Sequence, residues 1–424
     1  MKERFMIKAI RGVKDILPSE VGIWQYLEAT SQKILQNYGF SEFRVPIFED
    51  TALFVRSIGE ETDIVSKEMY TFPDRKGNSL TLRPEGTAPV VRAFVEHKLY
   101  TQSPYQKLYY QGPMFRYERP QAGRSRQFHQ IGAEVFGLAE PAVDAEMLTL
   151  IHDLFSKLGL SDITLFLNSV GCPENCRPRY KKVLQEFLRK DLGDLCPDCQ
   201  QRYEKNPLRI MDCKNEACQA KLSQAPVILD HLCPACLQHH QEVERLLKLA
   251  GIPYQINYRL VRGLDYYTRT AFEVTSSGLG AQNAIAGGGR YDHLVEDFGG
   301  PPTPAIGFAL GMERVVLALQ GQGITPKTAP LIYIAALGQA AREEAFLMAR
   351  ALRQRSLRVI MNYQDRSLKA LLKQASQMGA RFSIIMGENE IASRRLVVRD
   401  MLHSLQEEVD RGNIAEVLEA KVLI

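Results

Sequence analysis

Long apolar runs are absent from this 424-residue chain, and none approaches the roughly 20 residues of a membrane-spanning helix. The N-terminal stretch MKERFMIKAIRGVKD is charged and lacks the apolar core of a secretory signal. The hydrophobic content of 45% and charged content of 24% are those of ordinary globular proteins. We therefore expect a cytoplasmic protein of two or three domains with no membrane partner.

Two kinds of catalytic motif are also missing. The chain contains no phosphate-binding glycine loop of the GxxxxGK(S/T) or GxGxxG type. No Ser/His/Asp set stands out, and His129, next to an apolar strand, is assigned no role. No nucleophile is needed if catalysis works mostly by positioning and charge neutralisation, as in nucleotidyl or phosphoryl transfer.

Cysteine is confined to one segment, since all eight residues fall between Cys172 and Cys236. Disulfides are not expected in a cytoplasmic chain. Two of the four cysteine pairs are CxxC pairs with an internal proline, which is typical of structural zinc sites. The prediction is one zinc site, and the alternative is a small domain of reduced thiols; the predicted ligands are Cys196, Cys199, Cys233 and Cys236.

The net charge of +4 is unevenly distributed. Residues 326–424 hold 15 Lys and Arg against 11 Asp and Glu, which accounts for the whole excess. A basic terminal segment favours a polyanionic partner, although a basic solvated surface would give the same count.

The first three quarters of the chain predict an antiparallel sheet with flanking helices, interrupted by an insertion. Apolar spacing predicts a helix over 18–38, and FRVPIFE (43–49) is typical of a strand broken by Pro46. Further predicted elements are strand 79–83, a helix capped by Thr87, a hairpin of 107–118 and 127–137, helix 144–158, strand 162–169, the strand-rich segment 254–290 and a helix from Gly311 to Gly321.

The last part of the chain has a different pattern. After the linker GQGITPKTAP (321–330), strands and helices alternate from 331 to 401, which predicts an α/β domain with a largely parallel sheet. The predicted domain limits are 1–170 and 251–325 for one discontinuous α+β domain, 171–250 for a mostly helical insertion, and 326–424 for the α/β tail.

The stretch LVRGLDYYTRTAFEV (260–274) places Arg262, Asp265 and a tyrosine pair in a run whose ends predict a buried strand. Charges in such a run are costly unless each has a partner, so they indicate a ligand site. AGGGRYD (286–292) leaves a strand, and its glycines predict either close approach of the backbone to a flat ligand or a tight turn.

Two further segments carry charge beside apolar residues. The predicted hairpin holds Arg116, Arg119, Arg124 and Arg126 with Glu118 and Glu134, a set able to clamp a phosphate or to form a solvated charged surface. GFALGMERVVLAL (307–319) runs from a strand into a helix with Glu313 and Arg314 in its first turn, which favours an anion.

Taken in order, the helix and strand ending at Pro46, FRYERP…RSRQFHQ and GFALGMERV resemble the three signature motifs of class II aminoacyl-tRNA synthetases. LVRGLDYYTRTAFEV, AGGGRYD and LTLRPEGTAPVVRA are similar to motifs of the histidyl-tRNA synthetase family, and the resemblance covers nearly the whole chain. It implies activation of L-histidine with ATP and Mg²⁺ to histidyl-adenylate, then transfer to the 3′ end of tRNA(His). The tail would be the anticodon-binding domain.

The resemblance also implies roles for single residues. Arg262 and Arg116 would be catalytic residues at the α-phosphate, and Arg314 would hold the γ-phosphate with Glu118 also at ATP. Glu134 and Tyr267 would bind the imidazole nitrogens, and Glu85 and Thr87 the α-amino group. Gly86, Gln130 and Tyr266 would complete the histidine pocket, which Arg116 and Arg262 also contact.

The resemblance implies a homodimer with the first motif at its interface, although the apolar helix and strand there could equally be core. Arg124 and Arg126 would face the tRNA acceptor end or decorate the surface. The alternative is the histidine-binding regulatory subunit of ATP phosphoribosyltransferase, a paralogue that lacks the anticodon domain and has degraded catalytic motifs. The tail and an intact Arg262 argue against it.

Overall fold

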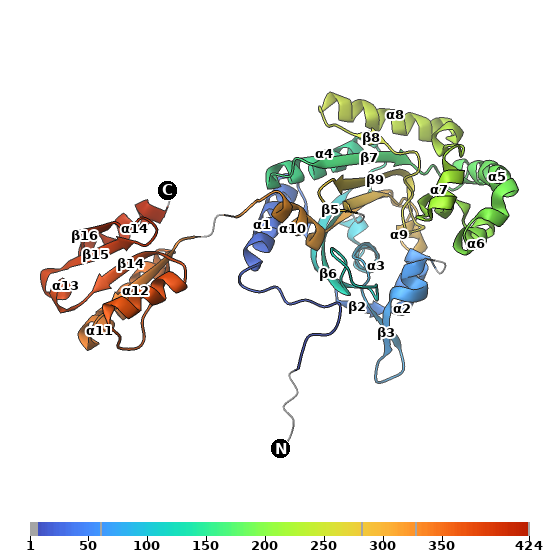
Figure 1. Cartoon of the computed structure of the whole chain (residues 1–424). Coiled ribbons are helices and arrows are strands. Elements are labelled where there is room, and N and C mark those ends of the chain that lie inside the picture. The colour runs from blue at the N-terminus through green and yellow to red at the C-terminus, as the bar shows by residue number, and fades with distance from the viewer. Residues whose placement is uncertain (1–6, 60–61, 281–282, 327–328, 423–424) are drawn as a thin grey trace, which may run out of the picture. The chain divides into compact units, whose positions relative to one another are not determined.

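The computed structural model describes residues 7–59, 62–280, 283–326 and 329–422. The chain forms two compact units, Met1–Pro326 and Lys327–Ile424 (Figure 1). Residues 1–6 of the predicted N-terminal stretch and 327–328 of the predicted linker lie outside the described residues. No helix among the described residues is long and apolar enough to cross a membrane.

An eight-stranded sheet forms the centre of the first unit, in the order β1-β5-β6-β11-β10-β9-β7-β8. The strands from β5 to β7 in that order pair antiparallel, and the short edge strands β1 and β8 pair in parallel. The predicted α+β class and the long hairpin are confirmed. The strands are β1 (Ser41–Glu42), β5 (Gln106–Phe115), β6 (Gln127–Phe136), β7 (Ile163–Ser169), β8 (Gln255–Ile256), β9 (Thr268–Ser276), β10 (Ala284–Arg290) and β11 (Ala305–Gly311).

Alternation along β6 separates the two faces of this sheet. Ile131, Ala133 and Val135 pack into the large core under the helices α1, α4, α8 and α10. Side chains on a strand alternate between faces, so Gln130 and Glu134 point the other way. That second face is covered by α3 and α9 and leaves room for a pocket. The bounds are α1 (Val21–Asn37), α3 (Thr87–Glu96), α4 (Pro141–Leu158), α8 (Pro234–Leu249), α9 (Leu294–Asp297) and α10 (Met312–Gly321).

The predicted strand 43–49 was wrong in its extent. Only Ser41–Glu42 and Phe48–Asp50 pair as strands, and they belong to different sheets. Proline donates no backbone hydrogen bond, and the carbonyl oxygens of Val45 and Pro46 accept from Arg83 Nη1 at 3.0 and 3.3 Å. The second sheet has the order β2-β4-β3, with β2 (Phe48–Asp50), β3 (Tyr70–Pro73) and β4 (Ser79–Leu82); near it lie α2 (Thr51–Ile58) and the π-helical turn η1 (Ile64–Glu68).

The strand predicted through Arg262 was also wrong. Residues 257–267 form no strand, and β9 begins at Thr268. Arg269 has a left-handed φ of 48°, and the backbone there bonds to Gly171 instead of continuing a ladder upstream. The charged residues therefore lie on a loop before the strand. The glycines of AGGGRYD lie inside β10, so the tight-turn interpretation is wrong.

The insertion is mostly helical, as predicted. It contains α5 (Cys176–Leu188), α6 (Pro197–Lys205), α7 (Glu216–Leu222) and the start of α8, joined by short 3₁₀ turns. Its core includes cysteine side chains together with apolar residues such as Tyr180, Leu184 and Ile210. The C-terminal half of α8 leaves this core, because Val243 and Leu247 pack into the core of the large sheet.

The second unit has a five-stranded sheet in the order β13-β12-β14-β15-β16. β13, β12 and β14 are parallel, whereas β15 and β16 are antiparallel additions. The predicted strand–helix alternation is confirmed, and β16, α13 and α14 were not predicted. The bounds are β12 (Leu331–Ala336), α11 (Gln339–Gln354), β13 (Arg358–Met361), α12 (Leu368–Gln377), β14 (Ala380–Met386), α13 (Glu388–Ser393), β15 (Arg395–Asp400), β16 (Gln406–Asp410) and α14 (Ile414–Val422).

Candidate functional site

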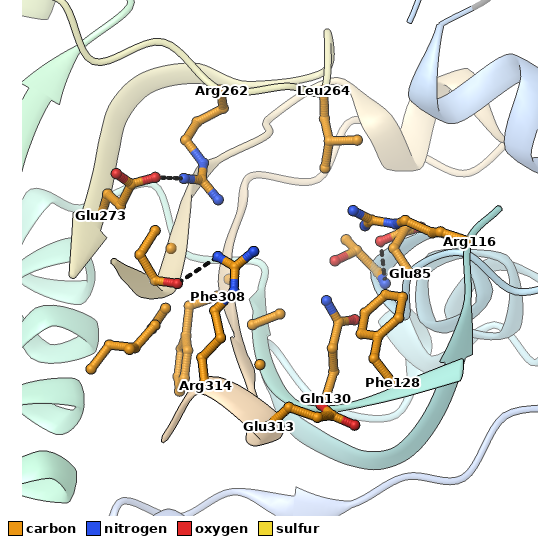
Figure 2. Close-up of a pocket in the computed structure, with 18 of the residues that line it drawn as sticks. Glu85, Arg116, Phe128, Gln130, Arg262, Leu264, Glu273, Phe308, Glu313 and Arg314 are labelled. Carbon is orange, nitrogen blue, oxygen red and sulfur yellow. Dashed lines mark hydrogen bonds and ion pairs between the residues drawn. The ribbon is translucent and has the colours of Figure 1, made fainter. Parts of the chain in front are cut away.

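A cavity of about 290 Å³ opens on the second face of the large sheet. It gathers residues from the hairpin, the start of α3, the loop before β9, and the junction of β11 with α10. Figure 2 shows Arg116, Arg262 and Arg314 pointing into a common space from different sides. The predicted residues that line it are Glu85, Thr87, Arg116, Glu118, Gln130, Arg262, Tyr266, Tyr267 and Arg314.

Arg262 reaches the cavity from the loop before β9. Its Nη1 bonds Glu273 Oε2 at 2.7 Å, which orients the guanidinium without enclosing it (Figure 2). A Cβ atom at Gly287 would lie 2.5 Å from Arg262 Nη2. One glycine of the AGGGRYD stretch thus makes room for a side chain of the same protein, and the same bare backbone lines the cavity.

Arg116 lies opposite Arg262. Its Nε donates to the carbonyl oxygen of Pro84 at 2.9 Å, and its guanidinium lies 5.2 Å from the centre of the Phe128 ring. The Nη1 atom is 3.9 Å from Glu118 Oε1, too far for a strong pair. The outer edge of the fork therefore remains directed at the cavity, where it can bind an anion.

Arg314 enters from the first turn of α10. Its Nε donates to the Gly123 carbonyl at 3.1 Å and its Nη1 to the Ala284 carbonyl at 2.7 Å. Burial, followed by the like charge of Arg124, lowers the pKa of Arg314. A bound anion would relieve both effects, which is the usual purpose of a crowded cationic pocket.

Glu85 has a structural role that was not predicted from the sequence. Its carboxylate accepts from the backbone N–H groups of Thr87 at 2.7 Å and Ala88 at 2.8 Å. The predicted cap at Thr87 was wrong, since Thr87 is the first residue of α3 and Gly86 precedes it as N-cap. A Cβ at Gly86 would lie 2.1 Å from the Tyr110 ring, so glycine allows the turn to pack there.

Glu134 is fully buried and is not itself among the residues that line the cavity; it lies behind Thr87 and Tyr291, which do line it. Its two oxygens accept from Thr87 Oγ1 at 2.8 Å and from the Tyr291 hydroxyl at 2.5 Å. Burial raises the pKa of Glu134 to about 8, and the two hydroxyl donors oppose this rise. Its strand partner in β11 is Gly307, where a Cβ would lie 1.5 Å from Glu134 Oε2. Any other residue at position 307 would clash with the Glu134 carboxyl group, so glycine is required there.

The tyrosine pair forms one wall. The rings of Tyr266 and Tyr267 are 4.7 Å apart, and Tyr266 meets the Tyr291 ring edge-on at 5.6 Å. Burial raises the pKa of both Tyr266 and Tyr267, so their hydroxyls stay protonated and can donate. The amide oxygen of Gln130 is buried and has no hydrogen-bond partner among the described residues, which indicates a ligand group.

The arginines of the loop between β5 and β6 differ in whether they line the cavity. Arg124 lines the cavity 3.1 Å from Glu118, whereas Arg126 stacks on the Tyr117 ring at 4.0 Å and donates to the Arg11 carbonyl. Arg119 is exposed. The structure therefore brings Arg116 and Arg124 to the cavity and not the full set of four.

Sequence reasoning missed Phe128, Glu273 and Tyr291, which all line the cavity. Glu273 could have been recognised from the sequence, since it is an acidic residue between the apolar residues Phe272 and Val274.

His129, to which no role was assigned, has a structural one. It bonds Glu313 through its backbone N–H and its ring Nδ1, both at 3.0 Å, and so joins β6 to α10.

The predicted four-cysteine site was wrong. Cys233 and Cys236 group with Cys172 and Cys176, whereas Cys196 and Cys199 group with Cys213 and Cys218. In each group the four sulfur atoms lie within 4.8 Å of one another, and either group could hold a metal ion. Each CxxC pair is local in sequence, but its partners come from different turns of the insertion.

Comparison with known proteins agrees with this geometry. A family model described as Histidyl-tRNA synthetase matches residues 12–315, and one described as Anticodon binding domain matches residues 331–421. Histidine--tRNA ligase of Pelotomaculum thermopropionicum is 50% identical over 414 residues, covering 97% of each chain. Its counterpart in Geobacter metallireducens is 52% identical over 404 residues, covering 95% of this chain and 97% of the relative.

Solved structures extend the likeness. Apo histidyl-tRNA synthetase of S. aureus has a TM-score of 0.82 at 36% identity, covering 97% of this chain and 99% of its own. A Bacillus halodurans protein named ATP phosphoribosyltransferase regulatory subunit/histidyl-tRNA synthetase has a TM-score of 0.66 at 20% identity, covering 90% and 98%. At that identity the likeness concerns the fold alone. On the family match and the full-length relatives, the chain belongs to the histidyl-tRNA synthetase family.

Proposed function

We propose that this protein activates L-histidine with ATP and transfers the histidyl group to the 3′ end of tRNA(His). The observation that carries the proposal is the convergence of Arg116, Arg262 and Arg314 on one cavity, with the buried Glu134 bonded to two residues of its wall, Thr87 and Tyr291. Three cations suit a polyphosphate, and a buried carboxyl group suits one donor nitrogen of a small ligand.

In the first step, a carboxylate oxygen of histidine attacks the α-phosphorus of ATP. The new O–P bond forms as the bond to the β-phosphate oxygen breaks, and pyrophosphate leaves with the electron pair. Negative charge builds up on the α-phosphate, where Arg262 and Arg116 neutralise it from opposite sides. The contacts of Arg262 to Glu273 and of Arg116 to Pro84 hold both side chains in place beforehand.

Arg314 holds the γ-phosphate at the far end of the cavity, with Glu118 at the ATP site. The class II reaction uses ATP with Mg²⁺, which binds the β- and γ-phosphate oxygens as part of the substrate. The carboxylates of Glu118 and Glu273 line the same cavity and are the oxygen ligands that Mg²⁺ prefers.

Histidine specificity follows from two polar groups at the imidazole. A neutral imidazole has one donor and one acceptor nitrogen. In its ionised form Glu134 would accept from the N–H, because each carboxylate oxygen then keeps a second lone pair beyond the bonds from Thr87 and Tyr291. The Tyr267 hydroxyl would donate to the other nitrogen. Gln130 and Tyr266 line the pocket beside them, and Glu85, Gly86 and Thr87 hold the α-amino end.

We also propose a cytoplasmic homodimer that binds the anticodon through its second unit. The match of residues 331–421 to the anticodon-binding model supports this use of the tail. The same match, with all three arginines directed at the cavity, favours the synthetase over a histidine-binding regulatory subunit of ATP phosphoribosyltransferase.

The test is ATP–pyrophosphate exchange with each of the twenty amino acids, using the natural protein and Arg262→His. Exchange should require histidine, and the variant should lose about 10²–10³-fold in rate, the typical effect of removing one group that binds the transition-state charge. Arg395→His in the second unit, an exposed arginine, is the matched control and should keep full exchange. Tight histidine binding without exchange would instead support the regulatory role.

A further inference from the structure

The cysteine groups of the insertion form a nested pattern. The outer group joins Cys172 and Cys176 at the beginning of the insertion to Cys233 and Cys236 at the start of α8. The inner group, Cys196, Cys199, Cys213 and Cys218, lies wholly between them in sequence. All eight thiols are free, and five of them are buried.

The sulfur spacing matches tetrahedral coordination. Cys172 Sγ lies 3.5 Å from Cys176 Sγ and 3.9 Å from Cys233 Sγ, and Cys196 Sγ lies 3.8 Å from Cys213 Sγ. Four sulfurs around a zinc ion at about 2.3 Å would be separated by about 3.8 Å. A disulfide would require about 2.05 Å, so these positions suit a shared ion and not paired bonds.

Backbone groups around the sulfurs are arranged for thiolates. Cys233 N donates to Cys176 Sγ at 3.1 Å, Cys196 N to Cys218 Sγ at 3.2 Å and Asn215 N to Cys213 Sγ at 3.4 Å. Amide donors to the ligating sulfur stabilise the charged form and orient it, as outer-shell partners do in metal sites. Each group therefore has both four ligand atoms and supporting donors.

We propose that the insertion binds two zinc ions, one in each group of four cysteines. Thiolate-only sites select zinc over the oxygen-binding Mg²⁺ and Ca²⁺. The outer ion closes the insertion where it leaves and rejoins the large domain, and the inner ion holds α6, α7 and the turn between them together. A helical segment of this size has a small core, and metal binding supplies part of its folding free energy.

The inner ion also has a positioning role for the loop that carries Arg262. Arg209 Nη1 donates to the Gly263 carbonyl at 3.2 Å, and Asn206 Nδ2 donates to Asp265 Oδ1 at 3.0 Å. Arg259 Nη1 donates to Gln219 Oε1 at 2.7 Å. These contacts connect the turns beside the inner cysteines to residues 259, 263 and 265 of the loop. That the braced loop places a catalytic arginine rests on the proposed function; the contacts themselves do not.

The test begins with metal analysis of protein purified under reducing conditions, by elemental analysis and native mass spectrometry. The natural chain should hold two zinc ions, and Cys176→Ser and Cys199→Ser should each hold one. Cys199→His, which keeps a ligand, should retain two, and so should Ser223→Ala, a control on the exposed surface of the insertion. X-ray absorption at the zinc edge of the natural protein should show sulfur ligands only. This measurement does not depend on the serine variants, so it tests the proposal even if they fail to fold.

Two results would overturn the two-ion arrangement: one ion per chain that both serine variants lose, or no zinc at all. The bracing is tested separately by amide hydrogen exchange of residues 257–267, which needs no enzymatic activity. Cys199→Ser should increase exchange there at least several-fold, with a smaller rise in Cys176→Ser. Loss of the inner ion with unchanged exchange would overturn the bracing, and failure of amino-acid activation alone would leave both findings intact.

Discussion

The two compact units differ in whether they bury charged side chains. In the first unit, Glu134, Asp144 and Arg290 have no solvent exposure. In the second, the buried polar side chains among the described residues are Asn362 and Ser383, neither of which ionises. Burying charge is costly unless it is paired, so the first unit concentrates it where the fold or the chemistry needs it. The second unit keeps its charges on the surface, where a polyanion can reach them.

Asp144 is the clearest buried charge outside the cavity. Its carboxylate accepts from Arg290 Nη2 at 2.7 Å and from the Thr270 hydroxyl at 2.6 Å, and lies 2.7 Å from His239 Nε2. Burial raises its pKa, but the Arg290 charge and the hydrogen bonds from His239 and Arg290 outweigh burial and leave the pKa lowered. These contacts join α4, β9, β10 and the insertion helix α8. Arg290 directly precedes Tyr291, so the network also supports the Glu134 site.

The largest effect should come from Asp144→Asn. Removing one partner of a buried ion pair leaves the other charge uncompensated, which costs about 3–5 kcal/mol in unfolding free energy. Urea unfolding followed by circular dichroism measures this loss. Glu146→Gln on the same helix removes a half-exposed partner of Lys107 and should cost about 1 kcal/mol or less. Equal losses in the two variants would contradict the contrast between buried and exposed pairs.

An intermediate effect should appear as a pH dependence at Glu134. Its folded pKa of about 8 exceeds the ordinary value of 4.5, so the folded state holds a proton that the unfolded state has lost. Between about pH 5 and 8 this group should therefore lower the unfolding free energy by about 1.4 kcal/mol per pH unit as pH rises. Glu134→Gln removes that slope, so the variant should gain stability relative to the natural protein from pH 6 to 8. Parallel stability curves would show that Glu134 is ionised in the folded protein.

The smallest effect, of opposite sign, should come from Asp400 in the second unit. Partial burial raises its pKa, but hydrogen bonds from His403 and Leu402 and the charge of Arg381 together lower it to about 2. The stabilisation is present above the ordinary value of 3.8 and is lost as pH falls through 2. Asp400→Asn should cost below about 1 kcal/mol at pH 7, because solvent screens this site. Thermal unfolding at pH 7 and pH 2.5 measures it, and an undiminished effect at the lower pH would contradict the assignment.

Local sequence predicted three parts of the candidate site, the charged stretch with Arg262, the arginine hairpin and the start of the helix with Arg314, and the resemblance to the synthetase family supplied the other residues. The strand that carries Glu134 followed from the apolar pattern of 127–137, whereas the role of Glu134 in the site came from the resemblance to the synthetase family. Arg314 follows Gly311 at a strand–helix junction, which the structure has as predicted. Arg262 was recognised as a charge among apolar residues, but its strand was wrong, because a tertiary contact at Gly171 sets where β9 begins.

The parts that could not be predicted depend on residues far apart in the chain. The space that Gly307 leaves for Glu134 arises from strand register, and the space that Gly287 leaves for Arg262 arises from the packing of the loop before β9 on β10; no local pattern specifies either. Glu85 was predicted as a ligand residue, and its bonds to the start of α3 depend on how the preceding turn folds back.

By itself, the sequence determined the long hairpin, most of the longer helices, the two-unit division of fold types and the residue types available for chemistry. Those follow from hydrophobic period and from motifs within about 20 residues of one another. Only the tertiary structure decided which cysteine pairs share a group and which arginines of the hairpin reach the cavity. Spacing along a chain constrains neighbours within a turn, whereas the meeting of distant segments depends on how whole elements pack.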